Sequence, residues 1–420
     1  MQKLQALRGF RDIFGEEVEK FRLIEGVARR YFGLLGYREM EIPVLEKTDL
    51  FVRSIGDATD IVEKEMFTFN DRSGESLTMR PEATAGIVRA YLQAGLYAKE
   101  RISRLFTIGP MFRHERPQKG RFREFHQLDV EVFGIPDSSL DAELLWMIWL
   151  MLTDLGVPSY RFEVNSVGCK GCREAFRSAL VDYLRSQEDY LCEDCRARMD
   201  RNPLRVFDCK NDQCAQLMRA SPLLFDHLCP ECRSEFESYL SLLDTFGVPV
   251  TVNKRLVRGL DYYTRAVFEV TSDDLGAQKA FAAGGRYDNL VQEIGGPSTP
   301  GSGFAIGMER LALLVPAPAG RDRPQFFLAA VGEKASRFIV PLLKAFIQEE
   351  MALSYTSGGR SLKSQMKYAA AIKADYVLIL GDQELERGSV ILRDMKDGSQ
   401  RDLPLNVESL PQEVRRSIAP

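Results

Sequence analysis

The 420-residue sequence predicts an α+β protein with more than one domain, and three observations lead to that prediction. Two apolar segments around a charged loop have the pattern of an antiparallel hairpin. A proline-rich segment near residue 320 precedes a region in which strands and helices alternate. All eight cysteines lie in one window before that segment. We therefore expect an antiparallel sheet flanked by helices, a small cysteine-rich insertion domain and a C-terminal α/β domain.

The first part of the chain mixes helical and strand periodicities. Apolar residues recur at helical spacing from 16 to 35, which predicts a helix. Residues 38–45 alternate toward Pro43, and the proline restricts that strand to an edge or a bend. The further elements expected here are, in order, hairpin strands at 105–112 and 122–133, a helix at 141–155, and strand-like sequence at 250–270.

The second boundary is the segment 316–324, which contains three prolines and can form neither a helix nor a central strand. Beyond it the pattern predicts strands at 326–331, 376–381 and 390–393 and helices at 336–351 and 361–374. The expected domains are therefore a core at 1–320, a cysteine-rich insertion at 168–236 within it, and a C-terminal domain at 325–420.

Composition excludes several classes of protein. Hydrophobic residues make up 45% of the chain and charged residues 28%, so it is neither disordered nor fibrous. The formal net charge of -4 excludes a protein that coats nucleic acid nonspecifically, so any contact with nucleic acid must come from local patches. The longest apolar stretches are too short to span a membrane, and residues 1–4 lead into charged sequence without a signal core. We expect a cytoplasmic protein without membrane contact.

The second hairpin strand has two unlike faces. Because side chains alternate along a strand, Gln127, Asp129 and Glu131 share one face and the apolar residues between them share the other. The polar face is either a solvated surface or part of a site. A site is favoured by two nearby histidines, His114 and His126, and by a cationic loop that contains Arg113, Arg116, Lys119, Arg121 and Arg123.

Several long motifs, in the expected order, resemble those of class II aminoacyl-tRNA synthetases, in the form found in the histidyl-tRNA synthetase family. Residues 109–116 (GPMFRHER) and 125–127 (FHQ) resemble motif 2, 303–311 (GFAIGMERL) resembles motif 3, and 36–45 is similar to motif 1. Residues 258–263 (RGLDYY) and 283–288 (AGGRYD) resemble the two histidine-specific motifs. One departure is Ala83, where the family usually has glycine.

The resemblance implies a two-step reaction in which histidine and ATP form histidyl-adenylate and the acyl group then moves to tRNA(His). Two anions approach each other in the first step, so fixed positive charge matters more than an acid or a base. Arg113 would bind the α-phosphate, Arg258 would approach it from the opposite side, and Arg310 would hold the γ-phosphate of ATP. Arg121 would also contact ATP, and Mg²⁺ would bridge the β- and γ-phosphates.

The resemblance also implies a histidine pocket. Glu131 and Tyr263 occupy the positions that bind imidazole, which has one N–H donor and one acceptor nitrogen. A site built on buried hydrogen bonds rejects analogues that lack them by about 10⁴–10⁵, so no editing domain is needed. The set is completed by Glu82, Thr84 and Gln127 at the α-ammonium group, Ala83 between them, and Tyr262 and Tyr287 lining the pocket.

The remaining partners are tRNA and a second copy of the chain. Motif 1 lies at a dimer interface in the family, so a homodimer is expected. The C-terminal domain resembles the family's anticodon-binding domain, and its cationic helix is either an RNA contact or a solvated face. The residues expected to contact tRNA are Gln118, Lys119 and Arg123 in the motif 2 loop and Arg360, Lys363 and Lys367 in the C-terminal domain.

The cysteines form four close pairs: Cys169 with Cys172, Cys192 with Cys195, Cys209 with Cys214, and Cys229 with Cys232. Such spacing is typical of structural zinc sites, and eight thiolates could serve two tetrahedral ions. The alternative is a set of reduced structural cysteines. The sequence does not reveal how the pairs combine in space.

A second function remains to be weighed. A synthetase-like paralogue serves as the non-catalytic regulatory subunit of ATP phosphoribosyltransferase, and such paralogues lack the anticodon-binding domain and have degraded motifs. Because residues 258–263, Arg310 and the C-terminal domain are all present here, the sequence favours a histidine–tRNA ligase that uses ATP.

Overall fold

The structure is a computed structural model. It describes residues 3–56, 59, 61–201, 203–209, 211–256, 260, 262–276, 278–317, 325–356 and 359–418. The chain divides into two compact units, Met1–Pro318 and Ala319–Pro420. None of the described helices is both long enough and apolar enough to cross a membrane.

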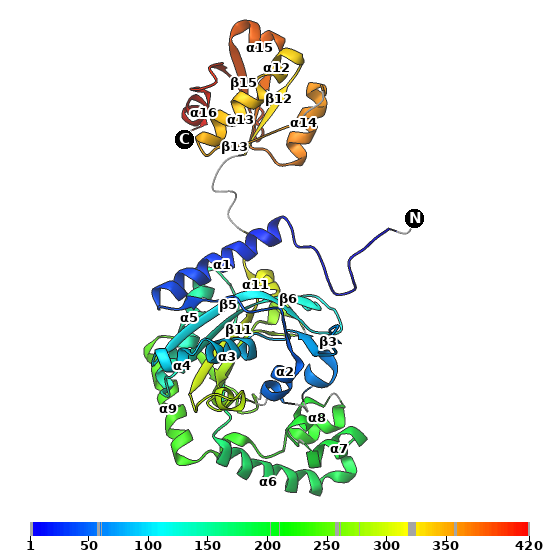
Figure 1. The fold of residues 1–420 in the computed structure, drawn as a ribbon, viewed down its shortest axis with the longest axis vertical. Helices are drawn as coiled ribbons and strands as arrows, with labels where there is room; N and C mark the ends of the chain where they lie inside the picture. The colour runs from blue at the N-terminus through cyan, green and yellow to red at the C-terminus, as the bar shows by residue number, and fades with distance from the viewer. Residues whose placement is uncertain are drawn as a thin grey trace. The chain divides into compact units, whose positions relative to one another are not determined.

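Unit 1 is built on an eight-stranded sheet (Figure 1). Its strands are β1 (Arg38–Glu39), β5 (Ser103–Phe112), β6 (Glu124–Phe133), β7 (Arg161–Ser166), β8 (Val250–Val252), β9 (Thr264–Thr271), β10 (Ala280–Arg286) and β11 (Gly301–Gly307). They follow the spatial order β1-β5-β6-β11-β10-β9-β7-β8. The outer pairs, β1 with β5 and β7 with β8, are parallel, whereas the inner neighbours are antiparallel. The expected antiparallel sheet is confirmed.

Strands β5 and β6 form the predicted hairpin, with Gly109 opposite Gln127 and Leu105 opposite Glu131. The alternation of side chains is as expected, but residues 128–133 of β6 are buried on both faces. Asp129 and Glu131 are each only 1% exposed. The alternative of a solvated polar face is therefore wrong, because other parts of the chain cover these carboxyl groups.

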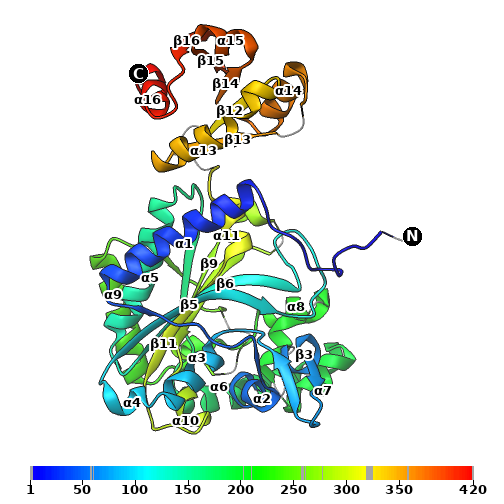
Figure 2. The same cartoon turned by 45° about the horizontal axis from the view of Figure 1, so that its top comes forward.

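Helices cover the apolar face of the sheet. They are α1 (Glu16–Leu34), α5 (Ser138–Asp154), α9 (Pro230–Thr245) and α11 (Met308–Leu314), and Figure 2 shows α1 lying across β5 and β6. Phe32 of α1 and Leu144 of α5 are fully buried in the same cluster as Val130. Helix α3 (Thr84–Gln93) belongs to a second apolar cluster, which contains Tyr262 and Tyr287. The sheet is thus sandwiched, and the carboxyl-bearing face of β6 is turned away from α1.

The prediction of one strand at 38–45 was wrong in extent. After β1, Met40 N–H still donates to the Phe106 carbonyl (2.8 Å), but the chain then passes Pro43, which has no N–H to donate. It joins a separate sheet with the order β2-β4-β3. The elements of this part are β2 (Leu45–Lys47), α2 (Thr48–Ile55), β3 (Phe67–Asn70), β4 (Ser76–Met79) and, after α3, α4 (Leu96–Lys99).

Between β7 and α9 the chain forms a helical insertion with α6 (Lys170–Ser186), α7 (Glu193–Arg201) and α8 (Asp212–Met218). These helices gather at the end of unit 1 opposite α1 (Figure 1). The sequence at 250–270 is not one strand, because the chain leaves the sheet after β8. The Asn253 side chain accepts the N–H of Arg255 (3.1 Å), a turn that ends the strand.

Unit 2 contains a five-stranded sheet with the order β13-β12-β14-β15-β16. Its strands are β12 (Gln325–Ala330), β13 (Ala352–Tyr355), β14 (Tyr376–Leu380), β15 (Ser389–Asp394) and β16 (Gln400–Pro404), and its helices are α12 (Glu333–Ser336), α13 (Ile339–Gln348), α14 (Leu362–Ala371), α15 (Asp382–Arg387) and α16 (Leu410–Ile418). The predicted helix at 336–351 corresponds to α13, which begins later and has Pro341 in its first turn, where proline is tolerated. The short helix α12 precedes it. The strands β13 and β16 and the helix α16 were not predicted.

Candidate active site

A cavity of about 290 Å³ lies on the carboxyl-bearing face of the large sheet. Its walls come from β6, β9, β10 and β11, from the first turn of α11, and from the loop that joins β5 to β6. Residues 82 and 84 and residues 260–263, except 261, complete the wall. Segments that are far apart in sequence therefore share one cavity, and it holds most of the residues that the motifs predicted.

Three arginines line one end of the cavity. Arg113 follows β5 and donates from Nε to the Pro81 carbonyl (2.7 Å). Arg310, in the first turn of α11, donates from Nε to the Gly120 carbonyl (3.3 Å) and from Nη1 to the Ala280 carbonyl. Arg121 forms an ion pair with Glu115. Burial lowers the pKa of all three guanidinium groups, yet arginine remains charged in proteins, so this end carries concentrated positive charge.

Carboxyl groups line the other end. The Thr84 hydroxyl donates to Glu131 Oε1 (2.5 Å), and the Tyr287 hydroxyl donates to Oε2. Burial raises the pKa of Glu131 to about 8, against the lowering effect of these two hydrogen bonds. The Glu82 carboxylate accepts the N–H groups of Thr84 and Ala85 (2.9 Å each) at the start of α3. Burial also raises its pKa.

Two other polar side chains that line the cavity have acceptor atoms without a hydrogen-bond partner among the described residues. Gln127 Oε1 and Asp129 Oδ2 are buried and find no hydrogen-bond partner in the part of the chain that the structure describes. Burial raises the pKa of Asp129 well above its usual range, and the neighbouring Glu131 and Glu82 raise it further. Sequence analysis did not assign a role to Asp129, although strand alternation had already placed it beside Gln127 and Glu131.

Three tyrosines pack against one another around the carboxyl end. The ring centroids of Tyr262 and Tyr263 are 4.7 Å apart, and those of Tyr262 and Tyr287 are 5.6 Å apart. All three rings are buried. The resemblance placed Glu131 and Tyr263 at the imidazole, and the structure adds a hydrogen bond from the Tyr287 hydroxyl to Glu131.

A glycine explains why the cavity is hollow at this point. Gly303 of β11 lies directly opposite Glu131 of β6. A Cβ atom at Gly303 would lie 1.9 Å from Glu131 Oε2 and 2.3 Å from the Val130 carbonyl oxygen. Any larger residue would displace the carboxylate, so this motif 3 glycine is required by close approach and not by a turn.

Sequence analysis also missed the residue that anchors α11. Both carboxylate oxygens of Glu309 accept the backbone N–H of His126 (3.0 Å each), and Glu309 Oε1 lies 3.0 Å from His126 Nδ1. Glu309 is 4% exposed and directly precedes Arg310. It therefore fixes the first turn of α11 against β6 and aims Arg310 into the cavity. An acidic residue directly before the motif arginine was the available signal.

Other predicted residues lie elsewhere. Arg258 is outside the described residues, so its position is not part of this geometry. Ala83 is fully buried but does not line the cavity. Gln118 and Lys119 are exposed on the β5–β6 loop. Arg123 is half-buried and donates to the carbonyl groups of Glu115 (3.2 Å) and Arg8 (3.4 Å), so protein contacts occupy it.

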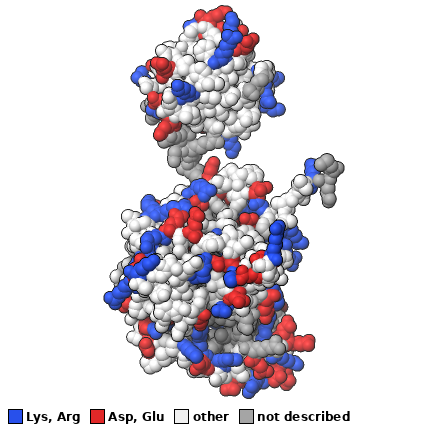
Figure 3. Space-filling view, in the orientation of Figure 1, with Lys and Arg blue, Asp and Glu red and all other residues white. Residues whose placement is uncertain are grey.

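The cationic residues of unit 2 are exposed. Lys363 and Lys367 lie one turn apart on α14, whereas Arg360 precedes the helix. Arg360 therefore lies outside the helix that carries the two lysines. Figure 3 shows cationic and anionic side chains intermixed over the face of unit 1 that is in view, which agrees with the near-neutral composition.

The eight cysteines form two clusters, and all of them are free thiols. The outer cluster contains Cys169, Cys172, Cys229 and Cys232, and the inner cluster contains Cys192, Cys195, Cys209 and Cys214. Within each cluster the four sulfur atoms lie within 4.8 Å of one another. The structure thus gives the pairing that the sequence left open: the first pair joins the last, and the two middle pairs join each other.

Known proteins resemble this chain over nearly its whole length. The sequence model of the histidyl-tRNA synthetase family matches residues 9–311, and that of the anticodon binding domain family matches residues 325–416. A histidine–tRNA ligase from Nitratidesulfovibrio vulgaris strain DP4 is 49% identical over 401 residues, which cover 95% of this chain and 96% of that protein.

Two solved structures have the same fold. The apo histidyl-tRNA synthetase of S. aureus superimposes with a TM-score of 0.80 and 31% identity, covering 98% of this chain and 99% of that one. An ATP phosphoribosyltransferase regulatory subunit/histidyl-tRNA synthetase from Bacillus halodurans has a TM-score of 0.65 over 91% of this chain and 99% of its own. Its identity is 20%, so that likeness concerns the fold alone.

Proposed function

This chain belongs to the histidyl-tRNA synthetase family, and we propose that it ligates L-histidine to tRNA(His) through a histidyl-adenylate, with release of AMP and diphosphate. The observation that carries the proposal is one cavity lined both by arginines, from the β5–β6 loop and α11, and by buried carboxyl groups, from β6 and the start of α3. Such a cavity suits a polyanion and a cationic amino acid bound side by side. A purely regulatory histidine sensor would not need the arginine end.

In the first step, a carboxylate oxygen of histidine attacks the α-phosphorus of ATP, and the bond to the β,γ-diphosphate breaks. The reaction joins two anions, so the main requirement is positive charge held in place. Arg113 and Arg310 meet that requirement because backbone carbonyl groups fix both guanidinium groups. Arg121 would neutralise further charge, and Arg258 would approach from the side that the family motif indicates.

The carboxyl end would select histidine. The α-ammonium group brings three N–H donors, and Gln127 Oε1 and Asp129 Oδ2 are buried acceptors that lack a partner among the described residues. Leaving such atoms unpaired is unfavourable, so an ammonium group here would relieve the desolvation of both. Glu82 would add negative charge from the start of α3.

Imidazole would bind deeper, at Glu131. Its N–H would donate to a carboxyl oxygen of Glu131, and the hydroxyls of Thr84 and Tyr287 also donate to this group. A ligand that cannot donate there would leave a buried carboxyl oxygen short of a partner, which is the physical basis of selectivity. Tyr262 and Tyr263 would close the pocket around the ring.

ATP enters such reactions with Mg²⁺, a cation that binds substrate phosphates and only a few protein oxygens. Glu269 lines the same cavity and offers a carboxylate of the kind that Mg²⁺ prefers. When bound, the ion would neutralise the β- and γ-phosphates. The carboxylate of Glu269 therefore fits a site for Mg²⁺ bound together with ATP.

In the second step, a hydroxyl of the terminal ribose of tRNA attacks the acyl carbon, and AMP leaves. Gln118 and Lys119, exposed on the β5–β6 loop, would meet the acceptor end, whereas Arg123 would support that loop from within. Residues 325–420 would bind the anticodon region, with Lys363, Lys367 and Arg360 near phosphates.

The organisation of the chain is part of the same proposal. Residues 1–320 would form the catalytic core of a cytoplasmic homodimer, with the insertion at 168–236. Zinc in that insertion would have a structural role, because no cysteine is among the described residues that line the cavity. The metal would therefore take no part in adenylate formation.

Exchange of labelled diphosphate into ATP, measured with each of the twenty amino acids in turn, tests the function. We expect exchange with histidine and essentially none with the other nineteen. Exchange that is absent with histidine, or equally fast with several amino acids, would refute the assignment. Charging of tRNA(His) compared with a non-cognate tRNA tests the second step separately.

A further inference from the structure

The two cysteine clusters have the dimensions of tetrahedral metal sites. Four thiolates held about 2.3 Å from a zinc ion lie about 3.8 Å from one another. Cys169 Sγ and Cys172 Sγ are 3.6 Å apart in the outer cluster, and Cys192 Sγ and Cys209 Sγ are 3.8 Å apart in the inner one. A disulfide would need sulfur atoms about 2.05 Å apart. A [4Fe–4S] cluster places a cube between its ligands and would hold them farther apart.

Backbone N–H groups point at the sulfur atoms in both clusters. In the outer cluster, Cys229 N–H donates to Cys172 Sγ (3.1 Å) and Cys232 N–H donates to Cys229 Sγ (3.5 Å). In the inner cluster, Cys192 N–H donates to Cys214 Sγ (3.3 Å) and the N–H of Asn211 donates to Cys209 Sγ (3.4 Å). Such contacts orient and stabilise ligating thiolates, so each cluster has the surroundings of a metal site as well as its ligands.

We propose that the chain binds two structural zinc ions, one in each cluster, and that the outer ion positions the histidine end of the cavity. The outer cluster can do so because it joins two helices at their starts. Cys169 is the N-cap of α6, and Cys229 is the N-cap of α9. An ion shared by these cysteines and their partners three residues later fixes the first turns of both helices relative to each other.

The first turn of α6 contacts the histidine pocket directly. Arg173, four residues after Cys169, donates from Nη1 to the backbone carbonyl of Tyr263 (3.2 Å). The strand that leads into the cluster makes a second connection, since Arg265 N–H donates to the Gly168 carbonyl and Val167 N–H donates to the Arg265 carbonyl (2.9 and 2.8 Å). The backbone on which Tyr263 lies is therefore held from the cluster side.

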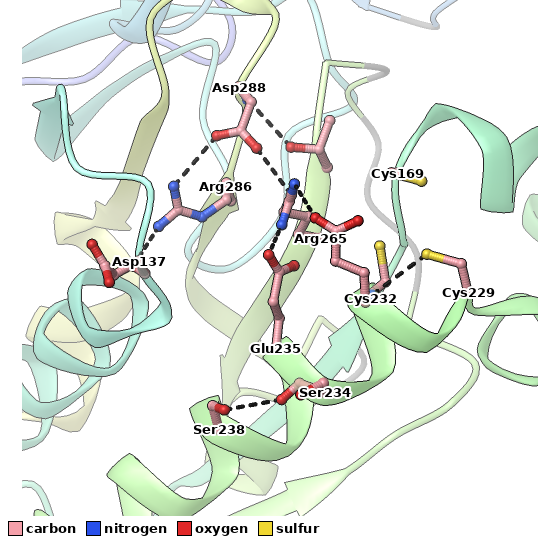
Figure 4. Close-up of polar contacts among 12 residues, drawn as sticks. Asp137, Cys169, Cys229, Cys232, Ser234, Glu235, Ser238, Arg265, Arg286 and Asp288 are labelled. Atoms are coloured by element: carbon pink, nitrogen blue, oxygen red, sulfur yellow. Dashed lines mark hydrogen bonds and ion pairs between the residues drawn. The ribbon is translucent and has the colours of Figure 1, made fainter.

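The start of α9 makes the corresponding contact on the other side. Glu235, three residues after Cys232, forms an ion pair with Arg265, and Arg265 Nε lies 3.3 Å from Asp288 Oδ2 (Figure 4). Asp288 directly follows Tyr287, which donates to Glu131 in the pocket. Arg265 also has φ of 51°, a left-handed conformation that surrounding contacts must maintain. A shift of α9 would thus reach both tyrosines through one arginine.

The inner cluster has a different set of connections. It joins α7 and α8. Helix α8 contacts the C-terminal half of α6, ten residues beyond Arg173, where the Tyr183 hydroxyl donates to the Leu217 carbonyl (2.8 Å), and it reaches the core where the Met218 carbonyl accepts from Arg255 Nη1 (2.7 Å). Arg255 does not line the cavity. The ion of the inner cluster would therefore hold the tip of the insertion together without fixing Tyr263 or Asp288.

Metal content tests the sites on the full-length protein, independently of any activity. Protein purified without added metal should contain about two zinc ions per chain by elemental analysis. After exchange with Co²⁺ it should show the absorption bands of tetrahedral cobalt bound to thiolates. Zinc below about 0.2 per chain together with failure to take up Co²⁺ would overturn the proposal, as would stoichiometric iron in place of zinc.

Matched variants test the positioning role, which rests on the proposed function, whereas the metal count does not. Cys229→Ser should lose one zinc ion and raise the KM for histidine in the exchange reaction about tenfold, with a smaller change in kcat. Cys229→His, which retains a zinc ligand, should keep the full zinc content and the original KM for histidine. Cys209→Ser in the inner cluster should lose the other ion and leave the histidine KM unchanged. Equal effects of Cys229→Ser and Cys209→Ser on that KM would overturn the positioning role.

A further variant leaves both metal sites intact. Glu235→Gln removes the charge through which α9 pairs with Arg265 but leaves the Arg265–Asp288 contact, so it should retain two zinc ions and still raise the histidine KM. This measurement keeps the test decisive if Cys229→Ser does not fold. An unchanged KM in Glu235→Gln would contradict the proposed route from the outer cluster to the pocket.

Discussion

The buried ion pair between Arg286 and Asp141 should be one of the strongest single determinants of the stability of unit 1. Arg286 lies in the segment that resembles a histidine-specific motif, yet its side chain is 1% exposed and does not line the cavity. Figure 4 shows it lying toward Asp137 and Asp288. Its Nε donates to Asp141 Oδ2 (3.0 Å), and its Nη groups donate to the carbonyls of Ile135 (2.9 Å) and Asp137 (2.8 Å). Arg286→Met is the informative change, because methionine fills much of the volume but has no donors.

The magnitude follows from what would remain buried. In Arg286→Met, Asp141 keeps one donor, the Ser302 hydroxyl at 2.7 Å, and loses its only ion-pair partner among the described residues. Removing one member of a buried pair typically costs about 3–5 kcal/mol, because the other charge is left uncompensated. We therefore expect the free energy of unfolding of unit 1 to fall by that amount.

Urea unfolding followed by tryptophan fluorescence is the appropriate assay. The chain has two tryptophans, Trp146 and Trp149, and both lie on α5 together with Asp141, so the signal reports on unit 1 and not on unit 2. Arg161→Met is a matched control: Arg161 pairs with Asp273 on the surface, where such a pair contributes about 0–1 kcal/mol.

A double variant separates the pair from its surroundings. Arg286→Met with Asp141→Leu replaces both charges by apolar groups and should recover part of the lost stability. A loss below about 1 kcal/mol in Arg286→Met, or no difference from Arg161→Met, would refute the reasoning.

The other predictions concern the cavity. Burial raises the pKa of Glu131 from about 4.5 to about 8, so the folded protein binds more protons than the unfolded chain between these pH values and its stability falls as the pH rises through them. Glu131→Gln should reduce the slope of unfolding free energy against pH by up to about 1.4 kcal/mol per pH unit. Equal slopes for the variant and the unchanged protein in urea unfolding at pH 5–8 would contradict this prediction. Arg310→Ala should slow histidine-dependent diphosphate exchange about 10²–10³-fold while circular dichroism stays unchanged, and a near-normal rate would exclude its role at the phosphates. Asp129→Asn should raise the histidine KM about tenfold with little effect on kcat, since it weakens ground-state binding of the ammonium group, and an unaltered KM would remove Asp129 from the site.

Local pattern was sufficient for much of this site. Strand alternation placed Gln127, Asp129 and Glu131 on one face, and their position in the cavity follows from that alternation. The motif arginines Arg113 and Arg310 line the same cavity. These features depend on short stretches of chain whose geometry is nearly the same wherever the pattern occurs.

The remaining features depend on contacts between distant segments. Nothing near Tyr287 in the sequence indicates that its hydroxyl donates to Glu131, because that contact is made where β6 and β10 approach the same neighbour, β11. Likewise, the backbone carbonyls that occupy Arg123 come partly from the N-terminal segment. The edge strands β13 and β16 are short and half-exposed, so their hydrophobic pattern is too weak to distinguish them from loops.

The order of the cysteine pairs along the chain has a consequence for how the insertion folds. Because the inner pairs lie entirely between the outer ones, the inner cluster can assemble as a local unit before the outer cluster closes. Its assembly shortens the stretch of free chain between Cys172 and Cys229. Because closing a shorter loop costs less entropy, the outer cluster then closes more easily. A crossed order would make each closure hinder the other. The nested arrangement therefore favours folding of the insertion in sequence, from its tip back toward the sheet.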